Sequence, residues 1–518
     1  MLSRFDTKSS FLFSCFIPLL VFFLISVPFS TGLYLLDDSS LLNQNEVSFL
    51  FDCKKTDGIL TDFSEINCGP IPNPGIEGVD LTSQFRETGF DFVRNHDFNG
   101  PTDISMIFPN MSKDPSDPSN YNFTLSDQFI TSIIDAGCNV FYRLGESAST
   151  EERFRQPPEN VSKWAEVCKH IVMHYNDGWA DGFYYNISYW EIWNEPDLSG
   201  FWNGTTEQYY TLYQEAAVTL KEYDPTLKIG GPCTSSIFNK NFTARFLSFV
   251  KENQIPLDFY SWHMYADTPY QLYNGSKLLR TLLDSFGFYD TESINTEWNI
   301  KILTPQRDKD NAKNAAFTVC SLSMFQDAEI DHAFRYRATQ DNNPLVRFIG
   351  FDLSLFSYDG LFKTPALSYL AFHYMNDQTP IRLQSPIVDS KQGITSLAGI
   401  SEDGTNITVL ISNFEAEDSN YELIIDHIPF DSSYIVATYL IDDEHHLQIV
   451  DEFNSEEDQM KVQGALSQSS VQFIRITNSS VLPDEGPDPL EIPWFLKISL
   501  FDPLAKILGV LLMILFFG

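Results

Sequence analysis

The feature that most constrains the fold is an alternation of short strand-like runs and amphipathic stretches between about residue 85 and residue 375. The runs are rich in β-branched and aromatic residues, and they lie at residues 90–96, 139–145, 189–193, 227–231, 257–265, 293–298 and 331–337. Repeated βα units of this kind predict a parallel sheet covered by helices. Their spacing predicts an α/β fold of the (β/α)8 or TIM-barrel type.

The helical periodicity disappears beyond about residue 380, and short segments of alternating apolar and polar residues replace it. These segments, at residues 406–414, 421–428, 434–441 and 471–478, predict a smaller C-terminal β-sandwich packed against the barrel. We therefore expect a barrel domain over residues 33–378 and a sandwich domain over residues 379–478.

Both ends of the chain have the composition of targeting segments. Residues 1–32 combine a basic start, an apolar stretch and small residues, which is typical of a signal peptide, although the stretch is also long enough for an uncleaved signal anchor. Residues 479–503 are rich in proline and acidic residues and suit a linker, while the apolar residues 504–518 resemble a membrane tether or a lipid-anchor signal but are short for a span. We expect the protein to enter the secretory pathway and to reach an extracellular, lysosome-like or vacuole-like compartment, with or without membrane attachment.

Nine N-x-S/T triplets without proline occur along the chain. One triplet means little, but nine behind a secretory leader predict N-glycosylation on exposed loops. The acceptor asparagines are Asn110, Asn122, Asn160, Asn186, Asn203, Asn241, Asn274, Asn406 and Asn478.

Six cysteines follow the leader, in a compartment that permits disulfides. Cys53 and Cys68 are close in sequence and flanked by turn residues, so we expect one local disulfide between them. The others are expected to be buried thiols. The cysteines lack the spacing of metal ligands, and we expect neither a metal ion nor an organic cofactor.

The formal net charge of −37 argues against one large class of partners. Seventy acidic side chains against 33 basic ones would repel DNA and RNA, which bind through basic surfaces. We therefore expect no nucleic-acid partner, and we interpret the acidity as an aid to solubility or to work in an acidic compartment.

Two expected strands end in a glutamate. In YWEIWNEPDLSGFWNG, at residues 189–204, a strand leads into Asn194 and Glu195, and in SINTEWNIK, at residues 293–301, another leads into Glu297. Side chains at the carboxyl ends of barrel strands face the active site, so the two glutamates are expected to face each other across one pocket. T-E-W-N alone would be a weak signal, whereas W-N-E-P at a strand end is far more specific.

Such a pair suits the cleavage of a glycosidic bond. One carboxyl group protonates the leaving oxygen while the other attacks the anomeric carbon, or activates a water molecule where the gap is wider. Aromatic residues crowd Glu195, and desolvation favours the protonated form that a general acid needs. The alternative is that both glutamates are ordinary loop acids.

The chain resembles glycoside hydrolase family 39, which contains β-xylosidases and α-L-iduronidases. The resemblance runs from about Phe90 to Met375 and rests on VRNHDF, YNFTLSDQFI, EIWNEPDLSGFW, LKIGGP, DFYSWHMYA and TPALSYLAFHYMN. It implies a retaining mechanism in which Glu195 matches the acid/base and Glu297 the nucleophile.

Other positions match the family one at a time. Arg94 and His96 match a pair on the second strand, where the arginine supports the charge of the nucleophile and the histidine contacts a sugar hydroxyl. Asn194 matches the residue that holds the 2-hydroxyl. His263 and Tyr265 match a pair near the nucleophile, where the tyrosine hydroxyl bonds the attacking carboxylate. For a histidine in particular, the alternative is a satisfied core residue.

The last expected strand departs from the xylosidase pattern. Tyr336, between Arg335 and Arg337, stands where the xylosidases have a tryptophan. An arginine here resembles the iduronidases, since a guanidinium group suits a uronate carboxylate, although both arginines are alternatively paired with nearby aspartates. Trp298, after the nucleophile, resembles the xylosidases. We include Trp298, Arg335 and Tyr336 among the expected substrate-binding residues.

These observations predict a retaining exo-glycosidase whose partner is an oligosaccharide or another glycoside. A β-xyloside is the first candidate substrate, and an α-L-iduronide or another glycoside is the second. A carbohydrate-binding surface glycoprotein without catalysis is the alternative from another class of protein. The oligomeric state is not indicated by the sequence.

Overall fold

The computed structural model describes residues 46–73, 78–96, 100–147, 155–339, 350–385, 393–430 and 433–478. The expected signal segment, linker and apolar tail, at residues 1–32, 479–503 and 504–518, lie outside the described residues. Within the described part of the chain, no helix is both long enough and apolar enough to cross a bilayer.

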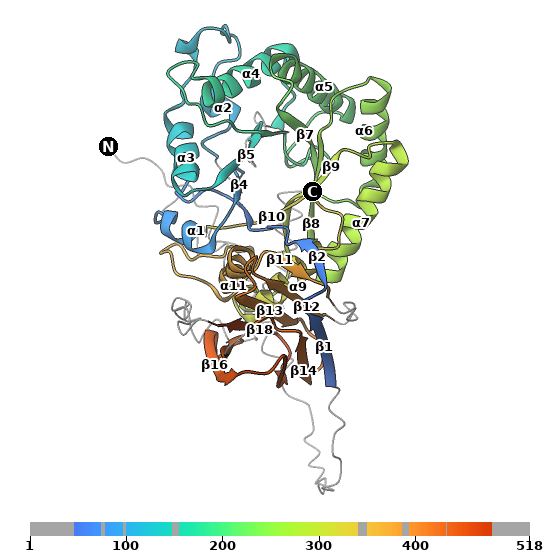
Figure 1. The fold of residues 1–518 in the computed structure, drawn as a ribbon. Helices are drawn as coiled ribbons and strands as arrows, with labels where there is room; N and C mark the ends of the chain where they lie inside the picture. Colours follow the sequence, from blue (N-terminus) through green and yellow to red (C-terminus); the bar gives the residue numbers. More distant parts are fainter. Residues whose placement is uncertain are drawn as a thin grey trace, which may run out of the picture. The chain divides into compact units, whose positions relative to one another are not determined.

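Eight parallel strands close into a barrel, and helices surround it (Figure 1). The strands are β3 (Glu65–Asn67), β4 (Phe92–Arg94), β5 (Asn139–Leu144), β6 (Tyr189–Ile192), β7 (Lys228–Thr234), β8 (Phe259–Ala266), β9 (Glu292–Ile300) and β10 (His332–Arg335). The helices are α1 (Thr82–Thr88), α2 (Ile104–Ile107), α3 (Thr124–Asp135), α4 (Val161–Asp177), α5 (Thr206–Tyr223), α6 (Lys240–Glu252), α7 (Pro269–Phe286), α8 (Gln306–Asp310), α9 (Ala312–Phe325) and α11 (Thr364–Gln378), with a short 3-10 helix at Pro118–Asn120. The predicted (β/α)8 barrel is confirmed.

Side chains fill the interior of the barrel toward its amino-terminal end. Phe141, Tyr189, Phe259, Ile294 and Phe334 form one buried cluster that is separate from the layer between strands and helices. Since side chains alternate between the two faces of a strand, further inward positions follow at every second residue toward the carboxyl ends. Inside the barrel, a site is therefore expected at the carboxyl ends of the strands.

The C-terminal region forms two packed sheets, which confirms the expected sandwich. One sheet has the strand order β1-β14-β17 and the other the order β16-β15-β18-β13-β12-β11-β2. The strands are β1 (Glu46–Asp52), β2 (Thr56–Ile59), β11 (Ile381–Leu383), β12 (Ile394–Ile400), β13 (Asn406–Asn413), β14 (Ser419–Asp426), β15 (Tyr434–Ile441), β16 (His446–Ser455), β17 (Gln459–Leu466) and β18 (Ser470–Thr477). The two sheets share a buried apolar cluster that includes Phe49, Val409 and Leu423.

Two strands of the sandwich come from the start of the described chain. β1 pairs in parallel with β14, and β2 pairs antiparallel with β11. Residues 46–59 therefore belong to the sandwich, which differs from the expected start of the barrel domain at residue 33. Pairing between segments so distant along the chain leaves no local signal in the sequence.

Helix α9 joins the two domains. Nearly all of its residues are buried, and it contacts β9 of the barrel as well as β12, β13 and β18 of the sandwich. The hydroxyl group of Ser412 donates to the backbone oxygen of Ala316 at 2.9 Å across this contact. The sandwich thus packs against helices α9 and α11 on the outside of the barrel.

The expected disulfide between Cys53 and Cys68 is wrong. Cys53 follows β1, and its backbone nitrogen donates to Asp426 of the sandwich at 3.0 Å. Cys68 follows β3 in the barrel, where its sulfur lies 3.6 Å from the backbone oxygen of His96. Because β2 runs in the sandwich between them, the two thiols lie in different domains despite their closeness in sequence.

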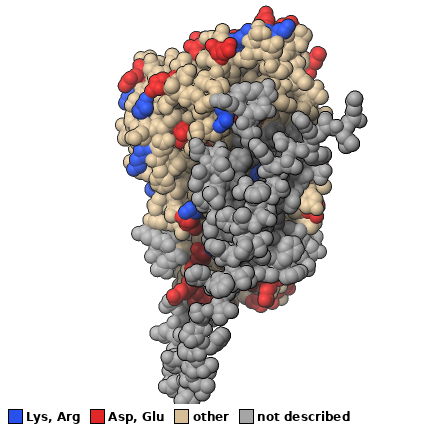
Figure 2. All heavy atoms as spheres, turned by 180° about the vertical axis from the view of Figure 1, so that it is seen from behind, with Lys and Arg blue, Asp and Glu red and all other residues tan. Residues whose placement is uncertain are grey.

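Most acceptor asparagines lie at the surface. Eight of the nine acceptor asparagines are exposed, and Asn406 is partly buried. On the face shown in Figure 2, acidic and basic side chains are scattered over the described surface. N-glycosylation itself stays a prediction.

Candidate active site

A sharp turn after β6 delivers Glu195. Trp193 and Glu195 have left-handed backbone conformations, with φ of 75° and 45°. Such conformations cost about 1–3 kcal/mol each in residues other than glycine and cluster at functional sites. The turn packs the ring of Trp193 against Trp202, at 5.1 Å between ring centroids, and directs Glu195 inward.

A β-bulge in β9 delivers Glu297. Trp262 of β8 pairs with Asn295, but the next residue, His263, pairs with Glu297, so Thr296 is an extra residue. Strict alternation from the inward residue Ile294 would point Glu297 outward. The bulge reverses the alternation and turns the carboxyl group into the barrel.

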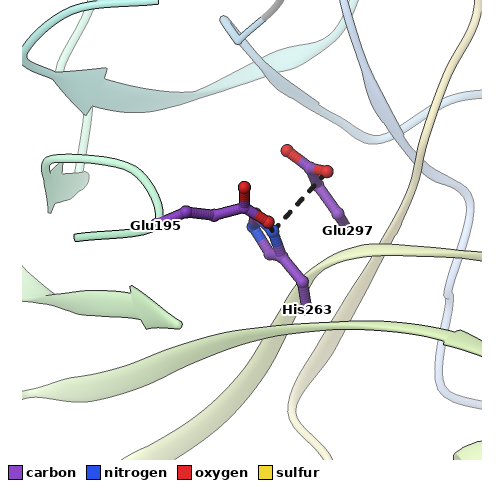
Figure 3. A group of neighbouring side chains, drawn as sticks. All are labelled: Glu195, His263 and Glu297. Atoms are coloured by element: carbon purple, nitrogen blue, oxygen red, sulfur yellow. Dashed lines mark hydrogen bonds and ion pairs between the residues drawn. The ribbon is translucent and has the colours of Figure 1, made fainter. Parts of the chain in front are cut away.

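Glu195, His263 and Glu297 converge at the carboxyl ends of the strands (Figure 3). Carboxylate oxygens of the two glutamates and a ring nitrogen of His263 lie within 4.8 Å of one another. Nδ1 of His263 is 2.7 Å from Oε1 of Glu195 and 3.5 Å from Oε2 of Glu297. The side chains are buried, with 9% of Glu195 and 6% of Glu297 exposed, so electrostatic effects between them are strong.

Both oxygens of Glu297 accept a hydrogen bond. Nη1 of Arg94 donates to Oε1 at 3.1 Å, and the hydroxyl group of Tyr265 donates to Oε2 at 2.7 Å. Burial and the charge of Glu297 raise the pKa of Tyr265, so its hydroxyl group keeps the proton that it donates. Nε2 of His96 lies 3.6 Å from Oε1. Donors on both oxygens favour the ionised carboxylate.

Arg94 is the fully buried centre of this network. It forms an ion pair with Glu191 at 2.7 Å and donates to the side-chain oxygens of Asn67 and Asn194 at 3.0 and 2.8 Å. Burial by itself lowers the pKa of Arg94. The charges of Glu191 and Glu297 raise it by more, so the net shift is upward. The guanidinium group therefore stays charged and fixes the orientation of Glu297.

The surroundings of the two glutamates differ in the groups that oppose the effect of burial. Burial, and then the charge of Asp197, raise the pKa of Glu195 to about 8. Burial also raises the pKa of Glu297, and the net shift stays upward although Arg94 and the Tyr265 hydroxyl act in the opposite direction. Burial lowers the pKa of His263 to about 4, so its ring is neutral at neutral pH. The donors on both oxygens of Glu297 make it the better candidate for the ionised partner, and Glu195 the better candidate for the acid.

The structure brings most of the predicted site residues together. Arg94, His96, Asn194, Glu195, His263, Tyr265 and Glu297 form one group, in which all but the partly buried Tyr265 are buried. Tyr336 lies at its edge, with its ring centroid 6.4 Å from that of Tyr265 and with part of its surface exposed. Contact of any of these residues with a sugar stays a prediction.

The structure corrects the predicted substrate contact of Trp298 and Arg335, because both lie on the outer side of the barrel. Trp298 is fully buried, and its Nε1 donates to the backbone oxygen of Ala333 at 2.9 Å. Arg335 lies over the Trp298 ring and donates to the hydroxyl group of Thr318 at 2.6 Å. Neither side chain faces the pocket, so the prediction that Trp298 and Arg335 bind substrate is wrong, and the uronate-binding alternative for Arg335 loses its basis.

Three buried residues of the network were missed in the sequence: Asn67, Glu191 and Cys233. Glu191 follows the inward residue Tyr189 by two positions, so alternation along β6 signals its direction. Asn67 ends the three-residue strand β3, which carries no strand-like pattern. Cys233 follows Pro232 in β7, and in the sequence it cannot be told from an ordinary small apolar core residue.

Glu195, His263 and Glu297 also offer three atoms that are suited to a divalent cation. The guanidinium group of Arg94, 3.1 Å from Glu297, opposes a cation by its charge. Glu195 favours its protonated form, which is a poor ligand. This set of residues therefore suits an acid and a nucleophile better than a metal ion.

Comparison with known proteins supports the family resemblance seen in the sequence. The model of "Glycosyl hydrolases family 39" matches residues 78–425. A β-xylosidase from Geobacillus stearothermophilus is 26% identical over 266 residues, which are 45% of this chain and 52% of that protein. A β-xylosidase from Caldicellulosiruptor saccharolyticus is 28% identical over 194 residues, which are 35% of this chain and 37% of that protein. The alignments thus span about a third to a half of the length of these relatives.

Solved structures extend the similarity to both domains. The structure of a glucosidase from Croceicoccus marinus is 28% identical, has a TM-score of 0.73 and covers 84% of this chain and 100% of that one. The match to the family takes in more than half of the chain, including the turn that holds Glu195 and the bulge that holds Glu297. The chain therefore belongs to glycosyl hydrolase family 39.

Proposed function

We propose that this protein is a retaining glycoside hydrolase that releases a terminal sugar by double displacement. The observation that carries the proposal is the closeness of two carboxyl groups, an oxygen of one lying within 4.8 Å of an oxygen of the other, with Arg94 and Tyr265 donating to both oxygens of Glu297. Retaining enzymes hold their carboxyl groups about 5–5.5 Å apart, whereas inverting enzymes need about 6.5–9.5 Å to admit a water molecule between sugar and base.

In the first step, the carboxylate of Glu297 attacks the anomeric carbon while Glu195 donates its proton to the glycosidic oxygen. The aglycone leaves as an alcohol, and the sugar stays bound to Glu297 as an ester. In the second step, Glu195, now a carboxylate, takes a proton from a water molecule that attacks the same carbon. Glu297 leaves with its charge restored, and Arg94 and Tyr265 are placed to stabilise that charge.

A β-xyloside is the first candidate substrate, because two relatives of this chain are β-xylosidases. A glucoside is the second candidate, because the glucosidase from Croceicoccus marinus is covered over its whole length at 28% identity. An α-L-iduronide has less support, since Arg335 points away from the pocket.

Hydrolysis of a panel of aryl glycosides by the wild type and by Glu297→Gln, side by side, tests the proposal. We expect one sugar to be cleaved by the wild type and not by the variant, and NMR to show that the first-formed sugar keeps the anomeric configuration of the substrate. Inversion of configuration, or full activity in the variant, would contradict the mechanism. Binding of sugars without turnover would favour a carbohydrate-binding glycoprotein instead.

We also propose that the protein travels the secretory pathway and carries N-glycans. The leader-like residues 1–32 and the exposure of eight acceptor asparagines support this. Removal of N-glycans with an endoglycosidase should increase the electrophoretic mobility of protein isolated from its native cells. Unchanged mobility, with every acceptor asparagine unmodified by mass spectrometry, would contradict it.

A further inference from the structure

Cys233 touches both halves of the candidate active site, and the mechanism above leaves its thiol unused. The residue is fully buried, with its sulfur 3.0 Å from Nε2 of His263 and 3.1 Å from Nη2 of Arg94. His263 in turn contacts Glu195, and Arg94 contacts Glu297. One sulfur atom therefore lies one residue away from each of the two carboxyl groups.

The backbone of Cys233 is tied to Glu195 as well. Its φ is 57°, in the left-handed region, and its carbonyl oxygen accepts a hydrogen bond from the backbone nitrogen of Glu195 at 2.9 Å. The backbone of Glu195 is also in the left-handed region, so this hydrogen bond joins two strained residues. Burial, and then the charge of Glu191, raise the pKa of the thiol, which consequently keeps its proton.

The hydrogen-bond partners determine where that proton points. Arg94 has only donors, so its Nη2 occupies a lone pair of the sulfur atom. Of the acceptors around the thiol, Nε2 of His263 is nearest, while the side-chain oxygens of Asn194 and Thr296 are farther, at 3.4 and 3.5 Å. The thiol proton is therefore best placed to reach His263.

We propose that Cys233 is a positioning residue that selects the tautomer of His263 and thereby the direction of the acid proton of Glu195. The thiol donates to Nε2, so the neutral ring carries its proton on Nδ1 and donates it to Oε1 of Glu195. The acid proton of Glu195 then resides on the other oxygen, Oε2, and is available to the glycosidic oxygen. In the opposite tautomer, Nδ1 would accept the Glu195 proton and hold it away from the substrate.

This inference rests on the proposed function. Comparing substrates with poor and with activated leaving groups distinguishes it from a purely structural role of Cys233. Cys233→Ala removes the thiol and keeps the β-carbon, while Cys233→Ser restores a donor. On aryl glycosides of the sugar that the wild type cleaves, we expect Cys233→Ala to lose about tenfold to hundredfold in kcat/KM for poor leaving groups and less than about threefold for dinitrophenyl glycosides, which need no acid. Cys233→Ser should recover most of the loss.

An equal loss on both classes of substrate would overturn the inference, because it would mean that the thiol acts only through Arg94 or through packing. Cys320→Ala is the matched control, since Cys320 is a fully buried thiol that bonds the backbone oxygen of Gly393 at 3.0 Å, next to the sandwich. We expect this control to lower Tm without any dependence on the leaving group.

The tautomer can also be measured without turnover. NMR of protein labelled with ¹⁵N-histidine, with His263 assigned by the signals lost in His263→Gln, should show the Nδ1-protonated form in the wild type. The Nε2-protonated form in the wild type would overturn the inference, even if Cys233→Ala fails to fold. Because this measurement needs no substrate, it is independent of whether the protein proves to be a glycosidase.

Discussion

Tyr265→Phe removes one donor from the carboxylate of Glu297 and leaves the rest of the site in place. The hydroxyl group donates to Oε2 at 2.7 Å within a buried network. A hydrogen bond to a buried charged group contributes about 1.5–3 kcal/mol. Because it stabilises the charge that Glu297 regains when the sugar ester is hydrolysed, its loss should slow that step by roughly tenfold to hundredfold.

The assay follows kcat on an activated aryl glycoside, for which the second step limits turnover, together with the pH profile of kcat/KM. Since the hydroxyl stabilises the ionised form of Glu297, its removal raises the pKa of Glu297, and the acidic limb of the profile should move to higher pH. A burst of released phenol should show that the sugar ester accumulates.

Tyr260→Phe is the matched control for this variant. Tyr260 lies on the same strand, is fully buried, and donates to the hydroxyl group of Thr243 at 3.0 Å on the outer side of the barrel. It should lose stability and keep the pH profile of the wild type. If Tyr265→Phe leaves the acidic limb in place or moves it to lower pH, the hydroxyl does not support the ionised form of Glu297, and the reasoning is refuted.

Three further expectations concern other contacts. Glu195→Gln should lower kcat/KM for poor leaving groups by about 10²–10⁴ while sparing activated substrates. It should also abolish the fall in activity as pH rises through about 8. Equal loss on both classes of substrate would contradict the role of Glu195 as the acid. Arg94→Met leaves Glu191 and Glu297 buried without a counter-charge and should cost about 3–5 kcal/mol in urea unfolding, so unchanged stability would contradict the network. Alkylation of the denatured protein without reductant should label both Cys53 and Cys68, whereas a peptide that links them would contradict the separation of the two thiols.

The barrel could be predicted because each of its longer strands carries a local pattern, whereas long-range pairing does not. Seven of the eight barrel strands coincide with the β-branched and aromatic runs of the sequence. β3 has only three residues, Glu65–Asn67, two of them polar, and was not recognisable. β1 and β2 were assigned to the wrong domain because their partners, β14 and β11, lie more than three hundred residues away.

The candidate site likewise contains residues that a local pattern predicts and residues that it does not. His263 and Tyr265 are two residues apart on a regular strand, so alternation places both in the pocket, where each meets a glutamate. Trp298 adjoins Glu297 and cannot share its face, and only the bulge at Thr296 decides which of the two points inward. A bulge depends on the neighbouring strands rather than on its own residues, which is why the sequence alone did not exclude Trp298.

Glu191 explains how one arginine serves a site that needs one charged and one neutral glutamate. Arg94 is 3.1 Å from Glu297 and 2.7 Å from Glu191, all three buried, so water screens none of these charges. At short range the guanidinium group still donates directly to Glu297. Arg94 also lowers the pKa of Glu195, although Glu191, 2.7 Å from the guanidinium group, offsets part of its charge. Burial and Asp197 then prevail at Glu195, which keeps the proton that the proposed mechanism requires.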